Sequence, residues 1–208
     1  MKTQLIRYIL LFVGLPLLFW SLGDFHEDTV LKESLSVLII ISFSLMIGQF
    51  FLARSNKVFL KEVKTTKVAK FHKIIGYVFV PILVFHPFFI VFPRYFEAGI
   101  EPKEAFITMI TTFNSIGVLL GISAWILIVI IGLTTLFRNR LGMNYRTWRV
   151  FHGILSVMFI TVANLHVLDL GSHLNTPLSL FIIAITIAGI LLLLKVYILK
   201  PKIAKPTK

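Results

Sequence analysis

Long runs of apolar residues alternate along the chain with short polar segments. Each run is long enough, or nearly so, to cross a hydrocarbon core, which takes about 20 residues of helix. None alternates polar and apolar positions as a membrane barrel strand does, and a lone segment in lipid must satisfy its own backbone hydrogen bonds. The pattern therefore predicts six transmembrane helices, at Leu5–Leu22, Leu35–Ala53, Ile74–Phe92, Ile116–Phe137, Val150–Leu168 and Leu178–Leu194.

The composition indicates an integral membrane protein. Of the 208 residues, 57% are hydrophobic and only 14% are charged, whereas soluble domains have about 25% charged residues. The chain has no Cys, which excludes disulfides, zinc–thiolate sites, iron–sulfur clusters and cysteine nucleophiles. We predict an all-α fold, with one six-helix bundle over residues 1–199 and a short basic tail at 200–208.

The first apolar run allows a second interpretation. Lys2 and Arg7 lie at its start, Pro16 lies inside it and Ser21-Leu22-Gly23 closes it, which also suits a cleaved signal peptide. Phe19-Trp20 is more typical of an interfacial anchor. We expect a membrane-spanning helix here, with the cleaved leader as the alternative.

Basic residues gather in the segments on one side of the predicted membrane. Eighteen of the 21 Lys and Arg residues lie in the N-terminus, the loops Arg54–Lys73 and Arg138–Arg149, and the C-terminal segment, and eight of the nine acids lie on the opposite side. The positive-inside rule then places both termini in the cytoplasm of a multi-pass protein of the cell (plasma or inner) membrane. The formal charge of +12 reflects this topology and predicts no nucleic-acid partner.

Histidine is the main ionisable residue within the predicted spans. His72 and His86 lie around the third span, and His152 and His166 lie in the fifth, each pair 14 residues apart. Fourteen residues make just under four helical turns, so the two members of a pair share a face and lie about 21 Å apart along the axis. One ion cannot bind both, because the ligands of a single-metal helical motif lie within one or two turns.

The third and fifth spans run in the same direction because both are odd-numbered. His72 and His152 should therefore lie near the cytoplasmic edge, and His86 and His166 nearer the outer edge. One histidine from each of two helices, at two depths, is the arrangement that holds two stacked haems with two axial imidazoles each.

Other residues fit this hypothesis less specifically. Phe79 and Phe159 each follow the inner histidine of their helix by seven residues, so their rings would lie between the two haem levels, although core packing explains them too. Arg94, Arg146 and Arg149 are candidates to contact haem propionates, although basic residues flank most membrane helices.

The histidine-containing segments resemble a known family. They are similar to the ferric reductase-like transmembrane domain of NADPH oxidases and ferric reductases, over about Leu35–Leu194. The residues that carry the resemblance are Phe71-His72-Lys73-Ile74-Ile75-Gly76-Tyr77 with His86-Pro87, and Tyr145-Arg146-Thr147-Trp148-Arg149-Val150-Phe151-His152-Gly153 with His166. The resemblance implies six helices and two b-type haems, with His72 and His152 as ligands of the inner haem and His86 and His166 as ligands of the outer haem.

The resemblance also implies transmembrane electron transfer, usually to ferric chelates or oxygen. Family members that act alone continue into FAD- and NADPH-binding domains with glycine-rich phosphate loops, and these 208 residues show no such motif. We therefore expect no FAD or NAD(P) site in this chain, and a separate flavoprotein reductase or a membrane quinol as electron donor.

The predicted function is that of an oxidoreductase component, ferric reductase-like, that moves electrons from the cytoplasmic face through two haems to an outer acceptor. Two alternatives stay open. One is a haem-bearing membrane anchor linked to quinone and a soluble reductase. The other is a small non-haem permease, although these spans lack the carboxylate that coupled carriers usually keep near the midplane.

The charge distribution generates a test of orientation. A reporter fused after Lys208 should be cytoplasmic, and one inserted near Glu101 should face outward, because basic segments are retained on the cytoplasmic side. Protease accessibility of the two reporters in sealed vesicles measures this. Either reporter on the opposite side would place His72 at the outer surface and reverse the predicted electron path.

Overall fold

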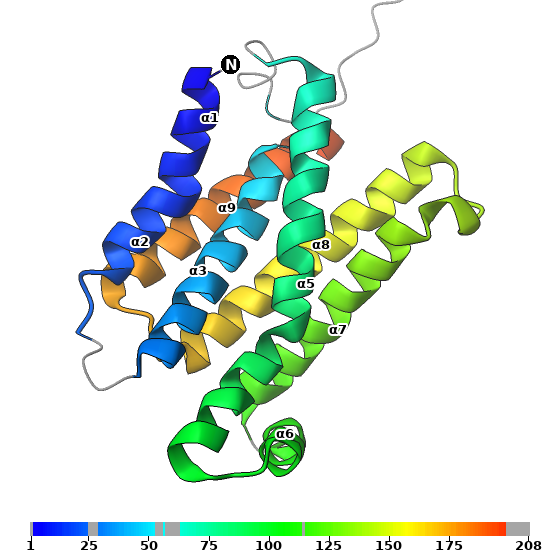
Figure 1. The fold of residues 1–208 in the computed structure, drawn as a ribbon. Coiled ribbons are helices and arrows are strands. Elements are labelled where there is room, and N and C mark those ends of the chain that lie inside the picture. The colour runs from blue at the N-terminus through cyan, green and yellow to red at the C-terminus, as the bar shows by residue number, and fades with distance from the viewer. Residues whose placement is uncertain (1, 25–28, 53–55, 57–62, 114, 199–208) are drawn as a thin grey trace, which may run out of the picture.

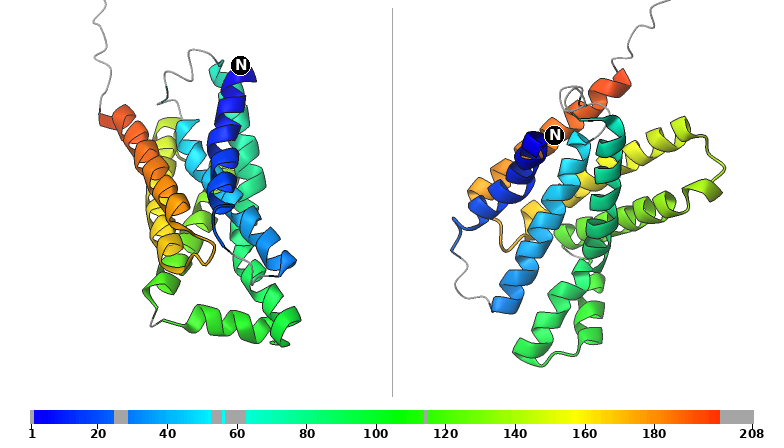
Figure 2. Two further views of the ribbon diagram at one scale, coloured as in Figure 1. Left: turned by 90° about the vertical axis from the view of Figure 1, so that its left-hand side faces the viewer. Right: turned by 45° about the horizontal axis from the view of Figure 1, so that its top comes forward.

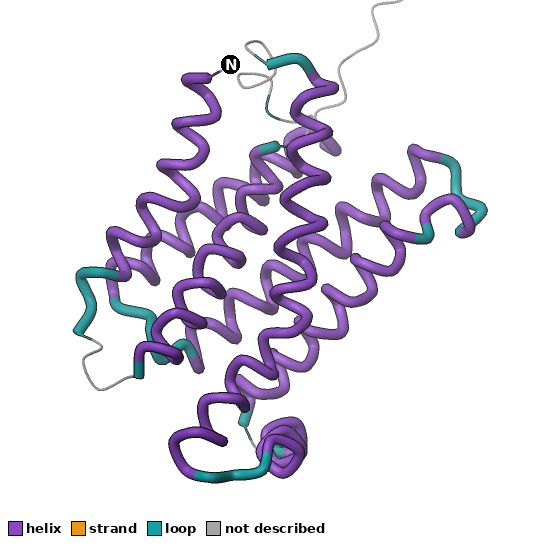
Figure 3. The backbone as a smooth tube through the Cα atoms, in the orientation of Figure 1, coloured by secondary structure: helices purple, strands orange, loops and turns teal. Residues whose placement is uncertain are grey.

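The computed structural model describes residues 2–24, 29–52, 56, 63–113 and 115–198, and within these ranges every regular element is helical (Figures 1 and 3). This described part contains six helices long and apolar enough to cross a membrane. The predicted all-α, six-helix architecture is therefore confirmed. The spans are Thr3–Trp20, Val30–Phe51, Thr65–Phe96, Ile116–Leu136, Tyr145–Leu170 and Thr176–Lys195.

The first span contains three helical elements. They are α1 (Lys2–Ile9), the π-helical turn η1 (Leu10–Gly14) and α2 (Leu15–Trp20). Pro16, at the start of α2, has no N–H to donate to the preceding turn. In the π turn, the Leu15 N–H instead reaches back to the Leu10 carbonyl, and such single turns are a common way to absorb an irregular position. The span ends at Trp20, two residues before the predicted Leu22.

The later elements are α3 (Val30–Phe51), α5 (Thr65–Ala98), α6 (Pro102–Thr111), α7 (Ile116–Leu136), the 3₁₀ turn η2 (Arg138–Arg140), α8 (Tyr145–Leu170) and α9 (Thr176–Ile198). Polar caps explain several of their starts. Ser115, Asn144 and Asn175 each accept a hydrogen bond from a backbone N–H in the first turn of α7, α8 and α9. With these caps, α8 begins at Tyr145 and α9 at Thr176, before the predicted starts at Val150 and Leu178.

Helix α5 is much longer than the apolar run that predicted it. Its 34 residues correspond to about 51 Å, whereas a hydrocarbon core is about 30 Å thick. Hydropathy identifies only the part of a helix that can lie in lipid. Lysine is a good helix former, so the helix continues through the basic residues before this part and begins at Thr65, not at the predicted Ile74. It ends at Ala98, and the next residue, Gly99, has a φ of 65°, the left-handed conformation that favours glycine.

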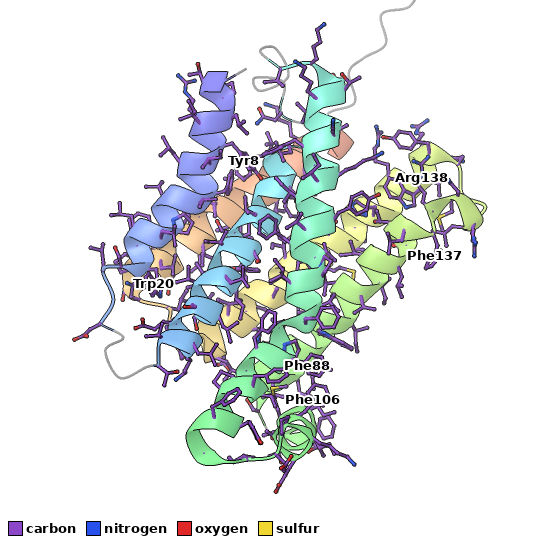
Figure 4. The ribbon with its side chains drawn as sticks, viewed as in Figure 1. Tyr8, Trp20, Phe88, Phe106, Phe137 and Arg138 are labelled. Carbon is purple, nitrogen blue, oxygen red and sulfur yellow. The ribbon has the colours of Figure 1, made fainter. Side chains whose placement is uncertain are left out.

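Helix α6 has no counterpart among the predicted elements. It is too short to cross a membrane, and it lies across one end of the bundle between α5 and α7 (Figure 2, left). The Phe106 ring of α6 stacks on the Phe88 ring of α5, with centroids 5.1 Å apart and planes within 2° (Figure 4).

The two ends of the bundle differ in charge. The start of α1, the start of α5, the α7–α8 turn and the end of α9 lie at one end (Figure 1). We call this the basic end, after its described residues Arg7, Lys64, Lys67, Lys70, Lys73, Arg138, Arg140, Arg146, Arg149 and Lys195. The opposite, acidic end carries Asp24, Glu33, Glu101, Glu104 and Asp169. Which end faces the cytoplasm stays a prediction.

Three predicted features fall on residues that are not described. The predicted end of the second span at Ala53, the loop from Arg54 to Glu62 apart from Asn56, and the basic tail at 200–208 lie outside the described residues.

Helix pairs form the body of the bundle. α3 packs along α5, α7 packs along α8, and α9 contacts both α3 and α8. The α8–α9 contact includes a buried hydrogen bond, which Asn164 Nδ2 donates to Thr186 Oγ1 over 2.7 Å. Polar side chains that meet across helices in lipid help to join them, because lipid offers no other partner.

The Asn164–Thr186 bond should contribute measurably to stability. Thr186→Val, combined with Asn164→Leu in a double-mutant cycle, should give a coupling free energy of about 0.6 kcal/mol, and at most about 1.7 kcal/mol, as for other hydrogen bonds between membrane helices. Denaturant unfolding in mixed micelles measures it. The control is Thr134→Val, because Thr134 Oγ1 donates to the Ile130 carbonyl within its own helix. A coupling energy of zero would contradict the assignment.

Candidate functional site

His72 of α5 and His152 of α8 meet near the basic end, and we call them the inner pair. Their ring centroids are 6.5 Å apart and their planes differ by 70°. A metal–imidazole bond is about 2.0–2.1 Å long, so two imidazoles that bind one metal ion from opposite sides have centroids roughly 6 Å apart. A Cβ at Gly76, one turn after His72, would have no neighbour within 4 Å, so there is open space beside this pair.

His86 and His166, from the same two helices, form the outer pair, and their rings are close enough to interact electrostatically. His86 Nδ1 lies 2.5 Å from the Leu83 carbonyl oxygen, and His166 Nδ1 lies 2.8 Å from the Gly117 carbonyl oxygen. A carbonyl can only accept, so each Nδ1 carries the proton and each Nε2 keeps the lone pair that binds metals. Hydrogen bonds of this kind orient metal-ligating histidines.

The residue after His86 explains how that ring is oriented. In an unbroken α-helix the Leu83 carbonyl would accept from the N–H of residue 87, but Pro87 has no N–H. The carbonyl is therefore free to accept from His86. The next carbonyl, that of Val84, accepts from Trp125 Nε1 of α7 over 2.8 Å. Of these two carbonyls, that of Leu83 is the one that the proline frees, and neighbouring groups commonly bind such carbonyls in a membrane helix.

Helix α7 lies close to α8 beside the outer pair. A Cβ at Gly121 would lie 2.7 Å from His166 Cε1 and 2.8 Å from its Nδ1. A Cβ at Gly117 would meet the Asp169 carboxylate and the Leu170 side chain. A larger residue at position 121 would displace the His166 ring, and one at position 117 would displace the Asp169 and Leu170 side chains, so glycine at both positions allows this close approach.

Aromatic and basic groups surround His152. The Trp148 ring stacks on it, with centroids 5.1 Å apart and planes 23° apart, and Thr135 Oγ1 lies 3.5 Å from its Nδ1. The Arg138 guanidinium lies 4.8 Å from the centroid of the Tyr145 ring and 4.9 Å from that of the Trp148 ring, at the turn between α7 and α8 (Figure 4). The inner pair is thus linked to the basic surface through stacked rings.

The donor set indicates what kind of metal group fits. Within the described part of the chain, no group of three or more His, Asp or Glu side chains is placed to hold a metal ion. Each level supplies two imidazoles. Such a set fits a metal that brings its own equatorial ligands, as haem iron does, and not a zinc or di-iron centre built only from side chains.

The other predicted site residues have no such defined role. Phe159 is buried and Phe79 is half-buried in the core. Arg94 and Arg146 are exposed, and Arg149 is half-buried. The predicted contacts of these arginines with haem propionates, and the position of both phenylalanines between haem levels, stay predictions.

The sequence analysis does not assign the roles that several residues have at the site. Trp148 precedes His152 by four residues, a spacing that puts both on one helix face. The contact between their rings could therefore have been predicted from the sequence. The roles of Gly121 and Arg138 depend on contacts between segments, and their spacing alone gives no signal. Pro87 acts within α5, where a proline signals that the carbonyl four residues earlier is free, but it does not signal which group binds that carbonyl.

The chain resembles known proteins of one family. Residues 38–163 match the family described as "Ferric reductase like transmembrane component", a range that contains His72, His86 and His152 and ends three residues before His166. A relative from Archaeoglobus fulgidus, described as an uncharacterized protein, is 40% identical over 159 residues, or 76% of this chain and 86% of the relative. No significant match to a solved structure was found. The chain belongs to the ferric reductase-like transmembrane family and is a multi-pass membrane protein.

Proposed function

We propose that this chain carries electrons across the cell membrane through two b-type haems, each held by one imidazole from α5 and one from α8. The observation that carries the proposal is the pairing of four histidines from the same two helices at two levels, with the inner rings 6.5 Å apart. Membership of the family supports a membrane electron-transfer component related to oxidoreductases. When bound, haem supplies the redox chemistry, because its iron takes up and releases one electron.

The chain's own residues orient the ligands and keep other molecules from the metal. The two imidazoles at each level would hold the iron between them and would leave it no position at which a substrate could bind. The Leu83 and Gly117 carbonyls hold the outer rings with Nε2 free to bind metal. The acceptor, a ferric chelate or oxygen, would then react at the outer edge of the site near the acidic end.

The donor would act at the basic end. A separate flavoprotein reductase and a membrane quinol are both compatible with the chain. The lysines of the first turns of α5 and the arginines of the α7–α8 turn would attract an acidic protein over about 8 Å at physiological salt. Part of this charge also serves the lipid headgroups. If a quinol reduces the haems rapidly and no flavoprotein does, the quinol-linked anchor is the right interpretation.

Haem content tests the proposed function directly. Purified protein should contain two low-spin haems per chain, quantified from a reduced-minus-oxidised visible spectrum. His86→Ala or His166→Ala should remove one haem and spare the other, because each level has its own pair of ligands. His173→Ala is the control, since this histidine lies in the α8–α9 loop and outside both pairs. A wild-type protein without haem, or with one ion bound by all four histidines, would refute the proposal.

The close approach of α7 to His166 gives a second test. Gly121→Ala should weaken haem binding at the outer level by roughly 10- to 100-fold, the usual cost of disturbing the groups that orient a metal ligand. The control is Gly132→Ala on the same helix, where a Cβ would make only an ordinary 3.5 Å contact with Val80. Haem retention after dilution, followed by visible spectra, measures the difference. Equal retention by the two variants would show that Gly121 does not position His166.

A further inference from the structure

The indole of Trp148 lies between the inner pair and the basic surface. Its ring stacks on His152 on one side, and the Tyr145 ring lies 6.2 Å away at an angle of 25°. The Arg138 guanidinium lies 4.9 Å from its centroid. These contacts fix the ring beside the inner ligand and bring a positive charge close to it.

The indole nitrogen of Trp148 is buried and has no hydrogen-bond partner among the residues that the structure describes. An indole N–H can only donate, and buried tryptophans usually find an acceptor, because a buried donor that has lost its bond to water without gaining another is destabilising. Trp125 shows the usual outcome in this same bundle, since its Nε1 donates to the Val84 carbonyl over 2.8 Å. The unpaired donor beside His152 therefore calls for an acceptor that the described part of the chain does not provide.

The surroundings indicate the chemistry of that acceptor. The Arg138 guanidinium brings a positive charge over the Trp148 ring, which favours an anion nearby. A hydrogen bond to an ionised acceptor is also about twice as strong as one between neutral groups. The b-type haem that the proposed function requires at the inner pair carries two carboxylates, its propionates, on one edge.

We propose that Trp148 is a positioning residue of the inner haem, and that its indole N–H donates to a haem propionate. This inference rests on the proposed function. Through this bond Trp148 fixes the rotation of the macrocycle about the His72–His152 axis, while its stacking fixes the plane of the His152 ring. The bond also disperses the negative charge of the propionate, which favours the reduced haem.

Trp148→Phe keeps an aromatic ring and removes the N–H. The inner haem should then be lost 10- to 100-fold more readily on dilution. Its midpoint potential should fall, by about 59 mV if the preference for the ferric state rises tenfold. Trp125→Phe is the matched control, because its N–H is already bonded within the protein, and it should leave the inner haem unchanged.

A measurement on the wild-type protein covers the case in which Trp148→Phe does not fold. With ¹⁵N-labelled tryptophan, the indole signal of Trp148, assigned by comparison with Trp20→Phe and Trp125→Phe, should move downfield when haem is added to the haem-depleted protein. An unmoved signal overturns the inference, as does a Trp148→Phe protein with wild-type haem retention and inner potential. A wild-type protein that takes up no haem refutes the proposed function instead, so the two failures are distinct.

Discussion

Two imidazole rings with centroids 6.5 Å apart, one from α5 and one from α8, set the separation that these two helices must keep. Helices in direct ridge-into-groove contact would leave no room for a flat group between them. The structure meets this constraint by giving each helix a different close neighbour, α3 for α5 and α7 for α8. Helix α9 contacts α3 of the first pair and α8 of the second, and so connects the two helix pairs on either side of the histidines.

The six spans and both histidine pairs could be predicted because each depends on a property of one segment. The length of an apolar segment indicates whether it can span a membrane, and a spacing of 14 residues indicates that two side chains share a helix face. The ends of α5 could not be predicted in this way, because the helix continues beyond lipid through Lys67 and Lys70. The short helix α6 was missed for a related reason, since it lies across the bundle and not through it.

The supporting part of the site was harder to predict, because it arises where segments meet. Gly121 is unremarkable in sequence, and only the approach of α8 shows that its missing side chain makes room for His166. Arg138 is one of the basic residues that predict the topology, yet its guanidinium also lies over the rings of Tyr145 and Trp148, next to His152. Pro87 differs, because it acts within its own helix: it frees the Leu83 carbonyl, and only the structure shows that His86 binds this carbonyl.

The outer histidines are oriented by backbone carbonyls, and this has a consequence for how sequence variation should be interpreted. Every residue type has a carbonyl, so the identity of the side chain at Leu83 is immaterial to the hydrogen bond that its backbone accepts. The requirement falls instead on a missing N–H at Pro87 and on missing side chains at Gly117 and Gly121. In this protein, residues that carry no reactive group are therefore the ones whose replacement by alanine would most directly disturb the outer ligands.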